Sequence, residues 1–409
     1  MMRLTFVFLI AGCAAVAQPR YDLLLKGGHV IDAKSGTSAV RDVAVSGRSI
    51  AAIAQNIPAS EARRTIDAAG LYVTPGLIDI HTHIFAGSMN RQYTGENCVR
   101  PDGFTFRSGV TTVVDAGSSG WRNFGEFRDQ IINKSKTRVF ALLNIVGSGM
   151  GGRPDVEQTT TDMDPQATAA VAKRYSDVVV GIKTAHYAGP EWIAVDRAVE
   201  AAKLSGGIVM VDFGNFRTER PFRDLVLKHL RPGDIYTHTY LGAVPMLDPQ
   251  GKLMPYLLEA RKRGVIFDVG HGAGSFSWKQ AIPAIKQGFV ADSISTDLHT
   301  ESMNAGMKDM TNVMSKFLAM GVPLEDVVAM STWRPAREIH HEELGHLSVG
   351  APADVALLRL VSGDFGFVDS NRLRHKGTQK LVAEMTLRNG EVVWDLNGIS
   401  SQDWDRATK

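Results

Sequence analysis

Five side chains that can bind divalent metal ions stand where predicted strands end. The sequence Ile80-His81-Thr82-His83 places two imidazoles one residue apart after an apolar run. Because alternate residues of a strand project to the same side, both rings can bind one ion. A single H-x-H pair is common by chance, but similar candidates end three later apolar runs: Lys183, His238 and Asp297. Their recurrence at strand ends predicts a metal centre.

The elements that would position these side chains form a repeating pattern. From Pro75 onward, apolar runs alternate with amphipathic helical segments. Runs such as residues 178–182 are apolar on both faces, which is typical of parallel strands covered by helices. Eight such units predict an α/β fold, a (β/α)8 TIM barrel over residues 75–340, with its chemistry at the carboxyl ends of the strands. The eight runs end near His81, Asp115, Asn144, Lys183, Asp212, His238, Val269 and Thr296.

Short strands with alternating polarity flank the barrel on both sides. They occupy residues 18–74 and 341–409, and neither group has enough strands for a stable sheet of its own. We therefore expect both chain ends to form one small β-sandwich domain. A loop between the last long strands is expected at Gly363 and residues 364–369.

Composition excludes several classes of protein. The 409 residues are 44% hydrophobic and 22% charged, which argues against disorder. The 45 basic and 43 acidic side chains give a net charge of +2, so no nucleic-acid partner is expected and a small-molecule substrate is favoured. The two cysteines exclude a disulfide framework and a thiolate-rich metal site. A homo-oligomer is left open.

The first 17 residues read as a secretory signal peptide. One arginine precedes an apolar run that ends in Ala15-Val16-Ala17, an A-x-A cleavage pattern. Residues 10–13 also resemble a bacterial lipobox, so lipid anchoring through Cys13 is the alternative. We expect an exported protein, periplasmic or secreted, and no integral membrane segment in the mature chain.

Lys183 at the end of an apolar strand requires an explanation, because burial of an unpaired ammonium is costly. One explanation is a structural ion pair. The other is that its neutral amine captures carbon dioxide as a carbamate, which would turn a cation into a carboxylate that can bridge two metals.

These residues and their motifs resemble the amidohydrolase superfamily, in particular its deacetylases and dihydroorotase-like metallohydrolases. The resemblance extends from Tyr21 to about Asp395 and rests on the sequences at residues 75–79, 181–183, 268–272 and 295–299. It implies that His81, His83 and Asp297 hold a buried metal, that carboxylated Lys183 bridges it to a second, and that His238 helps to hold this second metal. Two zinc ions per chain are the implied cofactors.

One position departs from the family pattern. Strand five usually ends in a histidine ligand, whereas this chain has Asp212. A carboxylate can also coordinate zinc and harder ions, so we assign Asp212 as a ligand. Alternatively, Asp212 pairs with a neighbouring cation, and His186 replaces it as a ligand.

The implied reaction is hydrolysis of an amide or ester bond, of the N-acyl or deacetylase type, by a metal-activated water. Asp297 would accept the proton of this water and deliver it to the leaving group. Cyclic-amide hydrolysis, as in dihydroorotase or hydantoinase chemistry, is one alternative, and a noncatalytic metal-containing binding protein is another. Residues in loops after the strands are tentative substrate contacts: Tyr187, His271 and Arg153, with Arg217, Arg220 and Ser275 as weaker candidates.

Overall fold

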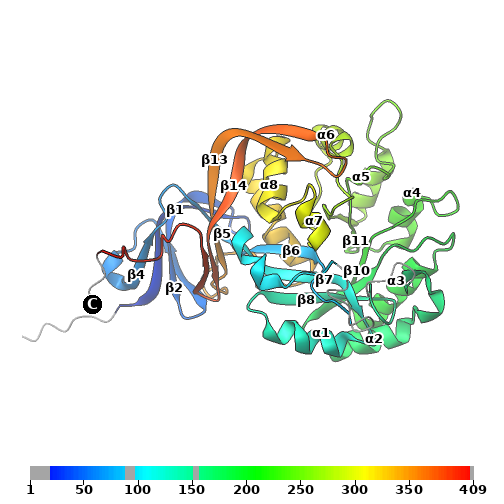
Figure 1. Cartoon of the computed structure of the whole chain (residues 1–409), viewed down its shortest axis with the longest axis horizontal. Coiled ribbons are helices and arrows are strands. Elements are labelled where there is room, and N and C mark those ends of the chain that lie inside the picture. Colours follow the sequence, from blue (N-terminus) through cyan, green and yellow to red (C-terminus); the bar gives the residue numbers. More distant parts are fainter. Residues whose placement is uncertain (1–18, 88–96, 151–155, 406–409) are drawn as a thin grey trace, which may run out of the picture.

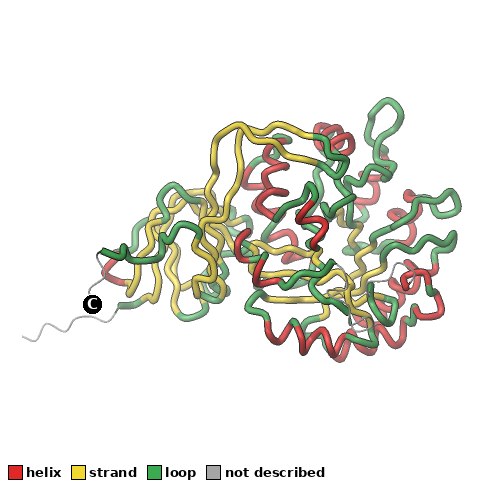
Figure 2. Tube along the Cα trace, in the orientation of Figure 1, coloured by secondary structure: helices red, strands yellow, loops and turns green. Residues whose placement is uncertain are grey.

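The computed structural model describes residues 19–87, 97–150 and 156–405. The expected signal peptide, Cys13 and Arg153 lie outside the described residues. Figure 1 shows a smaller body of strands beside a larger body in which helices surround a parallel sheet, and Figure 2 shows the same division by secondary structure. Within the described residues, no helix has the length and apolarity needed to cross a bilayer.

The larger body is built on a parallel sheet of seven strands. Neighbours in the sheet follow one another along the chain, and every pairing between them is parallel. This order places all seven carboxyl ends at one edge of the sheet. The strands are β6 (Leu77–Thr82), β7 (Val110–Gly120), β8 (Arg138–Asn144), β9 (Val179–Thr184), β10 (Ile208–Val211), β11 (Ile235–Tyr236) and β12 (Ile266–Phe267).

The eighth expected strand is present only as isolated bridges. Residues 293–298 pair in parallel with Asp268 through Ser293 and with Thr82 through Leu298. The N–H of Val269 donates to the carbonyl of Ser293 at 3.1 Å, and the N–H of His83 donates to the carbonyl of Leu298 at 2.9 Å. The parallel sheet is therefore curled, and this segment forms hydrogen bonds beside both its first and its last strand.

Helices follow the strands and bury their apolar faces against the sheet. In α3 (Ile193–Ser205), for example, Ala198 and Ala202 are fully buried, and the helix ends at Gly206, whose φ of 85° is the left-handed conformation of many helix ends. The other helices are α1 (Phe124–Gln130), α2 (Pro165–Arg174), α4 (Phe222–Asp224), α5 (Pro255–Lys262), α6 (Trp278–Lys286), α7 (Thr300–Asn304), α8 (Met310–Ala319), α9 (Leu324–Met330) and α10 (Trp333–Glu338).

Both ends of the chain contribute to a second sheet, as the sequence predicts. It joins β1 (Tyr21–Asp32), β2 (Thr37–Ser46), β3 (Ser49–Ala54), β4 (Ala62–Asp67) and β5 (Tyr72–Pro75) to β13 (Val355–Val368), β14 (Arg374–Arg388) and β15 (Glu391–Asp395). The order is β15-β14-β13-β5-β1-β2-β3, with β4 paired to β1. The antiparallel pairing of β13 with β5 connects the two ends, and one buried cluster contains Leu25, Val45, Val73 and Leu387.

The hairpin of β13 and β14 is longer than the sequence suggests. The loop expected at residues 363–369 is wrong for most of its length, because β13 continues to Val368 after an irregularity between Ser362 and Phe365. The far half of the hairpin extends over the larger body (Figure 1). There, the N–H of Leu381 donates to Ser315 Oγ at 2.9 Å, and Trp278 Nε1 donates to the carbonyl of Leu373 at 2.9 Å. The hairpin thus contacts both bodies.

Candidate metal centre and active site

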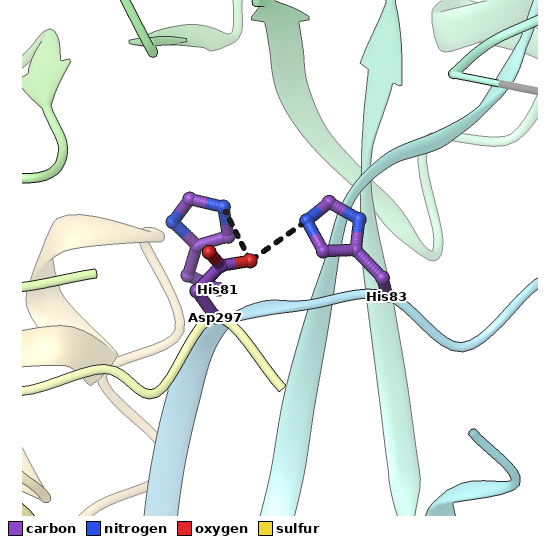
Figure 3. Close-up of side chains that lie close together, drawn as sticks. All are labelled: His81, His83 and Asp297. Atoms are coloured by element: carbon purple, nitrogen blue, oxygen red, sulfur yellow. Dashed lines mark ion pairs between the residues drawn. The ribbon is translucent and has the colours of Figure 1, made fainter. Parts of the chain in front are cut away.

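Three predicted ligands meet at the carboxyl edge of the parallel sheet. His81 lies near the end of β6, His83 follows it, and Asp297 lies in residues 293–298. Oδ1 of Asp297 is 3.0 Å from Nε2 of His83 and 3.6 Å from Nε2 of His81. Figure 3 marks both contacts with dashed lines. One ligand atom from each residue lies within 4.8 Å of the other two. This spacing fits coordination of one ion.

The histidines at this edge are held through the nitrogen that faces away from the site. Nδ1 of His81 is 2.9 Å from Thr237 Oγ1, Nδ1 of His83 is 3.2 Å from Ser118 Oγ, and Nδ1 of His238 donates to the carbonyl of Gly270 at 2.6 Å. Each ring therefore keeps Nε2 free for the site. In metal-binding histidines, the ring nitrogen that does not bind the metal usually forms a hydrogen bond of this kind, which fixes the orientation of the ring.

The charges at the site also fit a metal. Burial and the nearby Lys183 hold the pKa of His81 well below its usual value, which favours the neutral form of its ring over the charged form that Asp297 favours. Burial raises the pKa of Asp297, but the imidazoles of His81, His83 and His299 outweigh it and hold this pKa well below its usual value. A neutral imidazole and an ionised carboxylate are the forms that bind metal ions. The donor set therefore fits a divalent cation.

Lys183 in β9 lies next to these ligands and is fully buried. Its Nζ is 3.1 Å from Nε2 of His81 and 3.8 Å from Sδ of Met210. Among the described residues this amine forms no ion pair within 4.0 Å, which disfavours the structural explanation. Burial lowers its pKa, although Asp212 and Asp297 act in the opposite direction. Gly117 makes room for the side chain, because a Cβ there would lie 2.7 Å from Lys183 Cγ.

A second cluster surrounds Asp212, directly after β10. Its Oδ2 is 2.9 Å from Nε2 of His186 and 3.4 Å from Nε2 of His238. The other ring nitrogen of His186 lies 2.6 Å from Glu157 Oε2. The two residues considered as ligands at strand five, Asp212 and His186, therefore contact each other, and Asp212 also contacts His238.

The charged groups of this cluster stabilise one another's ionised forms. Asp212 raises the pKa of His186 well above its usual value, although burial opposes this and Glu157 adds to it. Burial raises the pKa of Asp212, but His186 and His238 outweigh it and hold this pKa well below its usual value. The ring of His186 is therefore a cation between two carboxylates in the absence of metal.

Three residues of the site have backbone conformations that are unfavourable for non-glycine residues. The φ angles of His186, His238 and Asp297 are 55°, 66° and 53°, in the left-handed region. Each such residue costs on the order of 1–3 kcal/mol unless the surrounding structure imposes it, and such residues cluster at functional sites. These backbone conformations set the directions in which the three side chains project at the site.

Two residues near the ligands were not among the sequence predictions. Glu157 lies in the turn Val156–Gln158 and is held by Asn144, whose Nδ2 donates to Oε1 at 3.1 Å. Nε2 of His299 lies 3.7 Å from Oδ2 of Asp297. A signal for His299 exists, since it follows Asp297 by two residues, whereas nothing in the sequence around Glu157 distinguishes it from a surface carboxylate.

The tentative substrate residues are mostly engaged elsewhere. His271 is fully buried, its Nδ1 donates to the carbonyl of Gly272 at 2.9 Å, and its Nε2 lies 2.6 Å from Nζ of Lys316. The hydroxyl of Tyr187 donates to Glu191 Oε2 at 2.6 Å. The guanidinium of Arg220 is buried and donates to the carbonyl of Tyr187 at 2.7 Å. The hydroxyl of Tyr187 and both ring nitrogens of His271 therefore already have partners outside the set of candidate metal ligands.

Comparison with known proteins places this site in a family. A sequence model described as the amidohydrolase family matches residues 64–189. A deacetylase of Brucella anthropi is 35% identical over 331 residues, which cover 79% of this chain and 80% of that protein. The chain belongs to the amidohydrolase superfamily. A deacetylase of Agrobacterium fabrum is 34% identical over 83% of both chains.

Solved structures of amidohydrolases agree with this assignment. The crystal structure of an adenine deaminase matches with a TM-score of 0.83 at 28% identity, over 92% of this chain and all of that one. The crystal structure of a dihydroorotase matches with a TM-score of 0.78 at 29% identity, over 91% and 99% of the two chains. The protein is therefore a hydrolase that acts on carbon–nitrogen bonds. Amidohydrolases use divalent metals, and the cluster of His81, His83 and Asp297 could hold one.

Proposed function

We propose that this amidohydrolase removes the acyl group from a linear N-acyl compound, using two zinc ions held at the carboxyl edge of the parallel sheet. The observation that carries the proposal is the convergence of His81, His83 and Asp297, with ligand atoms within 4.8 Å of one another, in a chain that shares four-fifths of its length with deacetylases. When bound, divalent metal supplies the Lewis acidity that ionises water near neutral pH.

Asp297 is the residue to which we assign proton transfer. Its side chain is ionised, its Oδ1 faces His83, and its Oδ2 faces His299. As general base it accepts the proton of the attacking water, and as general acid it delivers this proton to the leaving nitrogen. His83 and His299 on either side hold the carboxylate in place during both transfers.

Lys183 is assigned as a carbamate that bridges the two zinc ions. Support comes from complete burial, from a pKa lowered by that burial, and from the nearby Nε2 of His81. A neutral amine can add carbon dioxide, and the resulting anion would remove the cost of a buried ammonium beside metal cations. His238 and Asp212 are assigned to the second zinc, and His186 orients Asp212.

The substrate distinguishes this proposal from its alternatives. In the sequence comparison, dihydroorotase relatives match 20% to 31% of the chain, whereas the deacetylases of Brucella anthropi and Agrobacterium fabrum match 79% and 83% of it. We would measure turnover of N-acetyl amino acids, dihydroorotate, hydantoin and adenine by the zinc-loaded protein, with metal content determined on the same sample. Faster turnover of a cyclic amide or of adenine would replace the proposal, and a metal-loaded protein that is inert toward all four would favour a binding protein.

For localisation we propose export and cleavage after Ala17. Support comes only from the apolar run and the A-x-A pattern. Mass spectrometry of the protein from the membrane and soluble fractions of its host would test it. A mature chain that begins at Gln18 is expected; a lipid-modified chain that begins at Cys13 would replace the proposal by a membrane anchor.

A further inference from the structure

A buried hydrogen-bond network lies beneath the candidate metal ligands, and its centre is Asp268. This carboxylate is fully buried, as are the three hydroxyl groups that donate to it. Ser293 Oγ donates to Oδ1 at 2.9 Å, and Ser295 Oγ and Thr237 Oγ1 donate to Oδ2 at 2.6 and 2.7 Å. Two of these three hydroxyls connect further to the site histidines.

The first connection leads to His81. The single hydrogen of the Thr237 hydroxyl is donated to Asp268, so its oxygen can only accept from a further partner. That partner is Nδ1 of His81, at 2.9 Å. The hydrogen in this contact therefore belongs to Nδ1, and Nε2 of His81 carries an unshared electron pair that faces Lys183 and Asp297.

The second connection leads to His238. Ser295 donates its hydrogen to Asp268 and accepts from the N–H of Gly270 at 2.9 Å. The carbonyl of Gly270 in turn accepts from Nδ1 of His238 at 2.6 Å. A side chain at position 270 would break both connections, because its Cβ would overlap Thr237 Oγ1 and approach Nδ1 of His238 to 2.8 Å.

We infer that Asp268 is a positioning residue: through Thr237 it fixes the tautomer of His81, and through Ser295 it holds the backbone of Gly270, whose carbonyl orients His238. One buried carboxylate thereby orients a ligand of each proposed metal. The inference rests on the proposed metal centre for its functional meaning. Hydrogen bonds behind a metal-binding histidine are worth about 10- to 100-fold in metal affinity.

The test compares two buried threonines that both bond to Asp268. Thr237→Val removes the relay hydroxyl with little change of shape. Thr239→Val is the matched control, because the Thr239 hydroxyl donates to the backbone carbonyl of Asp268 at 2.8 Å and contacts no site histidine. Thr237→Ser retains the hydroxyl and is the rescue variant. Zinc affinity is measured by competition with a chromophoric chelator.

Thr237→Val is expected to bind zinc about 10- to 100-fold more weakly than the wild type, and Thr239→Val and Thr237→Ser are expected to stay close to it. Equal affinity of Thr237→Val and Thr239→Val, in a chain whose wild type binds zinc, would overturn the inference and leave the proposed function intact. Failure of the wild type to bind zinc would instead contradict the proposed function.

A measurement on the wild-type chain tests the tautomer of His81 directly, and a variant is needed only to assign the resonances. The full chain is labelled with ¹⁵N-histidine, and spectra are recorded before zinc is added, with the His81 resonances assigned by their loss in His81→Gln. A hydrogen on Nδ1 is expected. A hydrogen on Nε2 would show that Thr237 donates to His81, and this result would overturn the proposed relay.

Discussion

Nε2 of His186 lies 2.9 Å from Oδ2 of Asp212, so a histidine from the loop after β9 reaches the carboxylate at the end of β10. An imidazole is therefore present beside the position where the resemblance leads us to expect a strand-five histidine, but it comes from the loop after the neighbouring strand β9. Because the backbone of His186 is left-handed and Glu157 holds its other nitrogen, its orientation is set by the fold.

Asp212→Asn is expected to lower bound zinc from two ions to one per chain, because the amide is a weaker ligand than the ionised carboxylate and no longer attracts His186. Metal stoichiometry is measured by elemental analysis after dialysis against dilute zinc. Asp224→Asn, which changes a carboxylate paired with Lys228 away from these ligands, is the control. Two zinc ions in the Asp212 variant would remove this residue from the ligand set.

Asp297→Asn is expected to keep an oxygen ligand and most of the metal while turnover falls by about 100- to 10,000-fold, the usual contribution of general acid–base catalysis. Both kcat and zinc content are measured on the same preparation. Asp177→Asn, a carboxylate paired with Arg128 on the surface, should change neither. Wild-type kcat in the Asp297 variant would mean that another group transfers the proton.

Lys183→Ala is expected to lower the zinc content, and short-chain carboxylic acids such as acetate should partly restore both metal and turnover by occupying the place of the carbamate. Lys316→Met, at the second fully buried lysine, serves as a control for the loss of a buried amine. Unchanged stoichiometry in Lys183→Ala would argue against a bridging role.

Lys316 should make stability depend on pH. Burial lowers its pKa to about 7, whereas lysine in an unfolded chain has a pKa of about 10.4. Between these values the unfolded state binds more protons, so the free energy of unfolding should rise with pH by up to about 1.4 kcal/mol per unit, and this gain is absent below pH 7. Urea unfolding at pH 6 to 9 measures it.

The matched comparison uses two lysines. Lys316→Met should flatten the pH dependence between pH 7 and 9, although it also removes hydrogen bonds to the carbonyls of Gly306 and Val368. Lys203→Met, at an exposed lysine of α3, should keep the wild-type slope. Parallel slopes for the wild type and Lys316→Met would show that the Lys316 amine does not titrate in this range.

The sequence predicts the ligands on strands better than those in loops. His81, His83 and Lys183 follow from apolar runs that end where β6 and β9 end. Glu157 and His186 meet only because a short turn and a left-handed backbone bring them together, and no periodic pattern records such conformations. His271 follows the last short strand as expected, but its partner Lys316 lies 45 residues away on α8, so its burial cannot be read from its own segment.

The limits of periodicity also explain the misplaced loop. Gly363 and the polar residues after it are typical of a turn, yet β13 accommodates them as an irregularity and continues to Val368. Glycine in a strand often marks such an irregularity. Which of the two structures forms depends on what packs against the hairpin, and here α8 contacts the partner strand β14 through Ser315 and Leu381.

The long hairpin of β13 and β14 affects how the protein unfolds. The half of the hairpin next to β5 belongs to the sheet made by both chain ends. The half that contains its turn is hydrogen-bonded to α6 and α8 of the larger body. Unfolding of either body must break the contacts of one half of the hairpin and weaken those of the other half. Calorimetry should therefore record a single cooperative unfolding transition. A shortened chain that lacks the hairpin should lose the folded structure of both bodies together.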